Sequence, residues 1–155
     1  SRPVCSAVFF FSWSGDHRDL PSSPPRRSSD LRSIYSLLPR FADGSLPNVK
    51  LVQAVSWELF ELAGREHRDQ VLPRPDWLDS TVITNGATKL MHQWLPHKIA
   101  EHYAMGSDWD DRWRTGGSVD EVVAEAHLDP ESLAQGIQLF ANDREKRLRL
   151  MGHID

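Results

Sequence analysis

The sequence has little cysteine, no excess of basic residues and no long apolar run. Cys5 is the only cysteine in 155 residues, which excludes an internal disulfide framework and a cysteine-rich zinc site. No apolar run approaches the ~20 residues of a membrane-spanning helix, so we expect no membrane partner and a cytoplasmic protein. The formal net charge is −4. This acidity disfavours nucleic acid as a partner, because phosphate binding needs a basic face.

The short motifs that mark common catalytic centres are also absent. The sequence contains no Gly-x-Gly-x-x-Gly motif, no phosphate-binding loop and no Gly-x-Ser-x-Gly motif. His92, His97 and His102 are separated by five residues, which turns successive rings ~140° around a helix, so the three cannot share one metal ion. We therefore predict no catalytic residues, no metal site and no cofactor. An enzyme is the less favoured class of protein.

The first 31 residues differ in composition from the rest of the chain. They are rich in Ser, Arg and Pro and hold one short apolar run, at residues 7–11. Residues 15–31 resemble the translation of a common sequencing adapter. The positions that differ from that translation are Pro21, Ser23 and Pro25. We interpret residues 1–31 as a non-native, disordered leader and exclude them from the fold.

This interpretation sets the organisation of the remaining chain. Residues 32–155 then form a single helical domain, either complete in itself or the C-terminal part of a larger protein. If the leader is native instead, it is a basic tail rich in Ser and Pro. Five of the six tryptophans follow residue 31, and such large side chains favour a packed core.

Apolar spacing after residue 31 predicts helices. Residues 48–66 carry a stripe at helical spacing, formed by Val52, Val55, Leu59 and Leu62. Residues 81–90 fit either a tight hairpin or the start of a helix over 86–105, and we favour the helix. The expected fold class is all-α: a small bundle of about five helices that ends in a helix-turn-helix-like pair.

An acidic and aromatic run follows at residues 107–114. Ser107 and Asp110 are spaced as in a capping box, which predicts a short helix over 108–114. In such a helix Trp109 and Trp113 pack together in the core. The neighbouring carboxylates suit a hard cation, but acids are also common in the first turn of a helix, and we favour that structural role.

The most specific pattern is the helix pair at residues 118–140. Ser118 and Glu121 form a capping box, and Asp129 followed by Pro130 is a typical helix start. The apolar positions of a helix-turn-helix template are filled by Val122, Ala126, Leu128, Leu133 and Ile137. The segment resembles the C-terminal part of a family of small antitoxin-like bacterial proteins of unknown function. This resemblance implies a bacterial interaction or regulatory module.

We expect this helix pair to provide a contact surface for a protein partner or for self-association. The candidate contact residues are Glu131, Ser132, Gln135, Arg144 and Arg147. One alternative is a DNA-binding helix-turn-helix regulator, although Asp129 and Glu131 at the start of the second helix repel phosphates. The other alternative is the C-terminal helical fragment of a larger enzyme.

Overall fold

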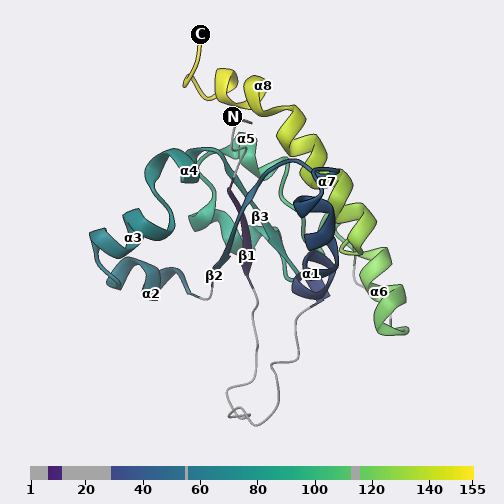
Figure 1. Ribbon diagram of the computed structural model, residues 1–155. Helices are drawn as coiled ribbons and strands as arrows, with labels where there is room; N and C mark the ends of the chain where they lie inside the picture. The colour runs from purple at the N-terminus through teal and green to yellow at the C-terminus, as the bar shows by residue number, and fades with distance from the viewer. Residues whose placement is uncertain (1–6, 12–28, 55, 113–115) are drawn as a thin grey trace.

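A three-stranded parallel sheet lies at the centre of the computed structural model, which describes residues 7–11, 29–54, 56–112 and 116–155 (Figure 1). Strand β1 (Ala7–Phe11) lies between β2 (Lys50–Ala54) and β3 (Ser80–Thr84). The register aligns Phe9 with Val52 on one side and with Val82 on the other. A continuous apolar run such as that of β1 is typical of a central strand in a parallel sheet.

Eight α-helices and one 3-10 helix lie in the described part of the chain. They are α1 (Ser29–Ala42), α2 (Trp57–Leu62), α3 (Arg65–Val71), α4 (Arg74–Leu78), the 3-10 helix η1 (Thr88–Trp94), α5 (Lys98–Glu101), α6 (Val119–Glu125), α7 (Pro130–Asn142) and α8 (Arg144–Leu150). The prediction of a mostly helical chain is confirmed. The helices surround a sheet, however, so the expected bundle of about five helices is corrected to a layered arrangement. Among the described helices, none has the length and apolar character needed to cross a membrane.

The helices lie on both faces of the sheet. In the order β2-β1-β3, the connection from β1 to β2 and the connection from β2 to β3 run in opposite directions across the sheet. Because crossovers between parallel strands are right-handed, they place their helices on opposite faces. Figure 1 shows α1 and α7 on one side, and α2, α3 and α4 on the other.

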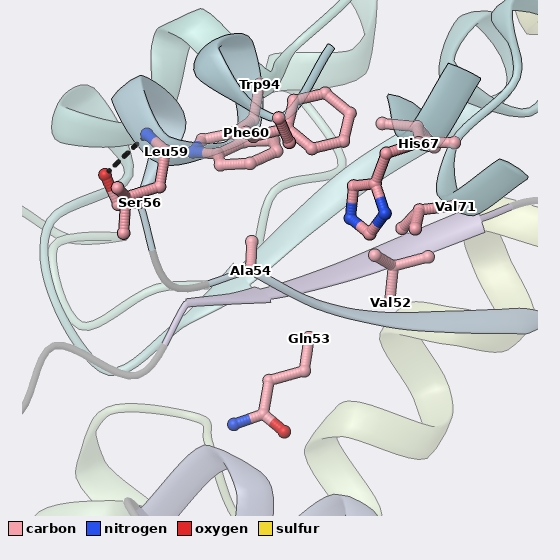
Figure 2. A pocket seen from close by; sticks show the side chains of 11 residues that line it. Val52, Gln53, Ala54, Ser56, Leu59, Phe60, His67, Val71 and Trp94 are labelled. Atoms are coloured by element: carbon pink, nitrogen blue, oxygen red, sulfur yellow. Dashed lines mark hydrogen bonds between the residues drawn. The ribbon is translucent and has the colours of Figure 1, made fainter. Parts of the chain in front are cut away.

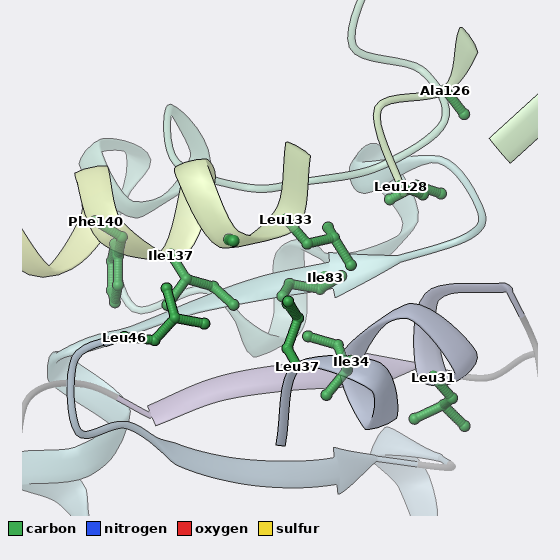
Figure 3. Packing of buried hydrophobic residues seen from close by; sticks show 11 residues of the cluster. Leu31, Ile34, Leu37, Leu46, Ile83, Ala126, Leu128, Leu133, Ile137 and Phe140 are labelled. Carbon is green, nitrogen blue, oxygen red and sulfur yellow. The ribbon is translucent and has the colours of Figure 1, made fainter. Parts of the chain in front are cut away.

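The first core lies between the sheet and the α1–α7 layer (Figure 3). Leu133, Ile137 and Phe140 of α7 are fully buried. They face Ile34 and Leu37 of α1. These residues recur at helical spacing on α7, so the packing accounts for one whole face of that helix.

The second core lies on the opposite face and is rich in aromatic rings. Trp57 and Trp94 meet edge to face with ring centroids 4.9 Å apart, and Phe60 lies 5.4 Å from Trp94. Trp77 donates its indole N–H to the Trp94 carbonyl oxygen at 2.9 Å. This cluster holds α2, α4 and η1 against Val52 and Val82 of the sheet.

The predicted helix over residues 48–66 is wrong in its first half. Lys50–Ala54 form strand β2, and α2 begins only at Trp57, where the Ser56 hydroxyl accepts a hydrogen bond from the Leu59 amide. Pairing with β1 overrides the helical spacing, since the alternation of Val52 and Ala54 inward with Gln53 outward also fits a strand.

The expected helix over residues 86–105, and the alternative hairpin, are also replaced. The chain leaves β3 and forms η1 and then the short helix α5. It returns to the sheet at Met105, whose amide donates to the Val82 carbonyl oxygen and whose carbonyl oxygen accepts from the Thr84 amide, both at 2.9 Å. Residues 87–90 therefore do not pair back on β3 as a hairpin requires.

The expectation that residues 1–31 are disordered and outside the fold is contradicted in two places. Residues 7–11 form the central strand, and α1 begins at Ser29, so that Leu31 is buried in the first core. Residues 1–6 and 12–28, which include most of the adapter-like segment, lie outside the described residues.

Candidate functional site

The helix pair α6–α7 is held by caps at both helix starts. The Ser118 hydroxyl accepts from the Glu121 amide at 3.3 Å, and the Glu121 carboxylate accepts from the Ser118 amide at 2.8 Å. Asp129 accepts from the Ser132 amide at 3.1 Å. Between the helices, His127 has a φ of 57°, a left-handed conformation that turns of this kind usually assign to glycine. The predicted helix-turn-helix-like pair is therefore present.

One face of this pair belongs to the core. Ala126, Leu128, Leu133 and Ile137 are buried as predicted, whereas Val122 is only half-buried and its neighbour Val123 packs against the core instead. A partner can reach only the opposite face of α7. This restricts the candidate site to the residues that face away from α1 and the sheet.

A groove of about 450 Å³ lies beside the core face, on the flank of α7 between this helix and residues 104–109. We name it the α7 groove, and it is bordered by Met105, Trp109, His127, Ser132, Gln135 and Leu139. Gly136 allows the close approach that shapes its floor, because a Cβ atom there would lie 2.4 Å from the Met105 sulfur atom. Two residues of the predicted contact surface, Ser132 and Gln135, thus border a real depression.

Trp109 and Leu139 are the exposed apolar residues of the α7 groove. Trp109 is 52% exposed and Leu139 is 55% exposed. The Trp109 ring stacks on His127 with centroids 4.0 Å apart, and its indole N–H donates to the Glu125 carbonyl oxygen at 3.3 Å. The indole is therefore oriented by two neighbours while much of its surface faces solvent.

This position of Trp109 corrects the expected helix over residues 108–114. Residues 107–110 form a turn, and Trp109 stacks on the α6–α7 turn rather than in the core. Trp113, its expected partner, lies outside the described residues.

The surroundings of the α7 groove are acidic. Residues 118–142 contain five acidic residues and neither lysine nor arginine. Hydrogen bonds from the amide and hydroxyl of Ser118 lower the pKa of Glu121. Burial raises the pKa of Asp129, but hydrogen bonds from Ser132 outweigh it, so the pKa lies below its usual value. Both carboxylates therefore stay charged at neutral pH.

The remaining predicted contact residues have other partners. The Glu131 carboxylate lies 3.1 Å from the Arg40 guanidinium in an exposed ion pair between α7 and α1. Arg144 is half-exposed and pairs with the carboxylate of Asp79. Arg147 is only 1% exposed, so its place on a contact surface is wrong.

Arg147 instead forms a buried ion pair below α8. Its Nη1 lies 3.0 Å from Oδ1 of Asp79, and Nη2 donates to the Phe140 carbonyl oxygen at 2.9 Å. The guanidinium lies over the Phe140 ring at 3.5 Å from its centroid. Burial lowers the pKa of Arg147, and the Asp79 charge opposes this shift. The pair attaches α8 to the residue that precedes β3.

The loops at the carboxyl end of β3 are linked to each other. The Asp108 carboxylate accepts from the Thr88 amide at 2.8 Å and from the Thr88 hydroxyl at 3.2 Å. Asp111 pairs with Lys89 at 3.0 Å. These carboxylates therefore join residues 108–111 to the start of η1, and in the described part of the chain the helix whose first turn they were expected to occupy is not present. Within the described residues, no three His, Cys, Asp or Glu side chains are grouped so as to hold a metal ion.

Comparisons with known proteins found no match: no family model, no curated protein and no solved structure resembles this chain.

Proposed function

We propose that the chain is a small cytoplasmic bacterial interaction or regulatory module, and that it contacts its partner through the α7 groove. One observation carries the proposal: the exposed side chains of Trp109 and Leu139 border the same groove as Ser132 and Gln135. Exposed aromatic residues beside a depression are typical of the centre of a protein interface.

The charge around the groove indicates the chemistry of the partner. With five acids and no basic residue over residues 118–142, a segment that carries Lys or Arg beside apolar residues is complementary. An Arg side chain also stacks well on an exposed indole such as that of Trp109.

The proposal is tested by selecting, from a library of displayed random peptides, those that bind the full chain. We expect the selected peptides to be rich in basic and apolar residues. Trp109→Ala and Leu139→Ser should each lower the affinity for a selected peptide by at least about tenfold, as measured by titration. Both side chains are half-exposed, so the variants should keep the wild-type circular dichroism spectrum.

The matched control is Leu150→Ser, which alters an equally exposed leucine at the end of α8, away from the α7 groove. It should leave the affinity unchanged. Peptides that bind all three variants as tightly as the wild type, or a selection that enriches no peptide, would contradict the proposal.

The DNA-binding alternative makes a different prediction for the same protein. The start of α7 carries Asp129 and Glu131, and Arg40, which lies beside Glu131, is already paired with it. We expect no shift of duplex DNA at low salt. A shift that weakens steeply as salt rises would favour the regulator instead.

A further inference from the structure

A second cavity lies at the carboxyl end of β2, on the face of the sheet opposite α7. Its volume is about 200 Å³. Its walls are mainly apolar and come from Val52, Ala54, Leu59, Phe60, Val71 and Trp94. Figure 2 shows Val52 and Ala54 pointing toward this cavity, whereas Gln53 points to the other face of the sheet.

Among the described residues, His67 is the only ionisable one that lines the cavity. Figure 2 shows its imidazole ring beside Val71 and above Val52. Within the described residues the ring has no hydrogen-bond partner, and the residue is exposed, as expected at the mouth of a cavity. The Ser56 hydroxyl also lines the cavity, but it already accepts from the Leu59 amide at 3.2 Å and donates to Glu58 at 2.9 Å. His67 is therefore the polar group available to a ligand.

The position and charge of the cavity indicate what it accepts. Open parallel sheets bind ligands beyond the carboxyl ends of their strands, and ligand sites typically combine apolar walls with a few polar groups. No carboxylate of the described residues lines the cavity. On the adjoining helices, Glu61 pairs with Arg68 at 2.9 Å and Asp69 with Arg65 at 3.5 Å, and the Glu58 carboxylate accepts from the Ser56 hydroxyl at 2.9 Å. An anionic ligand therefore meets no carboxylate in the described lining itself, and two of the neighbouring acids are offset by arginine.

We propose that this cavity binds a small apolar carboxylic acid. The apolar body of the ligand lies against Phe60, Val71 and Trp94, and its carboxylate accepts a hydrogen bond from His67. The site is separate from the α7 groove, and its occupation does not depend on the proposed protein contact.

The experiment compares octanoate with octanol, which has the same chain without the carboxylate. Binding to the full chain is followed by calorimetry, and the His67 ring protons are followed by NMR. We expect saturable binding of octanoate, a shift of the His67 signals, and an affinity at least about tenfold higher than that of octanol.

Two variants separate the cavity from a general apolar surface. His67→Phe should keep the apolar wall and reduce the affinity for octanoate to that for octanol. His102→Phe is the matched control, since His102 is also exposed and lies outside the cavity. It should bind octanoate like the wild type.

A third variant tests the apolar part of the cavity without changing His67. Ala63 lines the cavity at the end of α2, so Ala63→Met should fill the cavity and weaken the binding of both octanoate and octanol. The proposal is overturned if octanoate does not saturate, if it perturbs residues other than those of the cavity, or if His67→Phe binds it as tightly as the wild type.

Discussion

The buried pair of Arg147 and Asp79 joins α8 to the residue that precedes β3. Their side chains are 1% and 7% exposed, so each charge depends on its partner. Arg144 provides a second cation to the same carboxylate, from the solvent side. The arrangement places two positive charges around one buried negative charge at the start of β3.

We predict that Arg147→Met lowers the free energy of unfolding by about 3 kcal/mol, because it removes one partner of a buried charge and two hydrogen bonds to the Phe140 carbonyl oxygen. Urea denaturation at neutral pH measures this. Lys146→Met, in the same helix turn but exposed, should change stability by less than about 0.5 kcal/mol. Equal effects of the two substitutions would show that Arg147 contributes nothing specific.

At the scale of single residues, the sequence predicts which side chains cap helices better than it predicts which side chains are buried. Ser132 and Gln135 do border a groove, and Asp129 and Ser118 do cap their helices. Arg147 was expected on an exposed contact surface, because nothing local indicates that Asp79 lies across from it in space. Burial is a property of tertiary packing, and a local pattern of charges does not contain it.

At the scale of elements, the capping box of α6 makes the helix pair sensitive to acid. Hydrogen bonds from Ser118 hold the pKa of Glu121 below its usual value of 4.5. A carboxylate with a lowered pKa stabilises the fold fully above the unfolded value, and this contribution is lost as the pH falls through the folded value. We therefore expect α6 to lose protection against amide exchange below about pH 4.5.

The variant Glu121→Gln tests this assignment. Glutamine can still accept from the Ser118 amide but does not titrate, so the variant should show the same protection of α6 at pH 6 and at pH 3. The amides of α7 report on Asp129 separately, since its own cap involves Ser132. A wild-type loss of protection that persists unchanged in Glu121→Gln would assign the acid sensitivity to another group.

Helices whose first turn carries capping residues were predictable from the sequence, and strands that depend on pairing with a distant strand were not. The starts of α6 and α7 are marked by caps that act within one turn, and both lie where the sequence places them. Residues 50–54 form a strand despite a helical apolar stripe, and two members of that stripe, Leu59 and Leu62, are 64% and 81% exposed. Their periodicity was compatible with two structures, and the presence of β1 decided between them.

At the scale of the whole molecule, strand β1 connects the two halves of the sheet. Within the described residues, β2 and β3 pair with β1 and not with each other. The α1–α7 layer and the aromatic layer pack on faces of that same sheet. Both candidate sites therefore depend on a strand that sequence analysis assigned to a non-native leader.

The substitution Phe9→Pro tests that dependence directly. Proline removes a backbone N–H and is excluded from central strands, and Phe9 is aligned with a partner on each side, Val52 and Val82. We predict a loss of at least about 2 kcal/mol in the free energy of unfolding, as expected for a disrupted central ladder with an unpaired buried group. Thermal and urea denaturation followed by circular dichroism measure it.

Phe9→Val is the matched control, because it keeps the backbone N–H and has a high strand propensity. If only the proline variant is destabilised, residues 7–11 act through their backbone as the central strand. If both variants and a chain that lacks residues 1–11 unfold like the wild type, the apolar run is not part of the stable fold. The sheet edges of β2 and β3 would then lie open toward each other, and such unpaired edges bind a strand from another source. The same denaturation curves thus decide whether residues 7–11 complete this sheet.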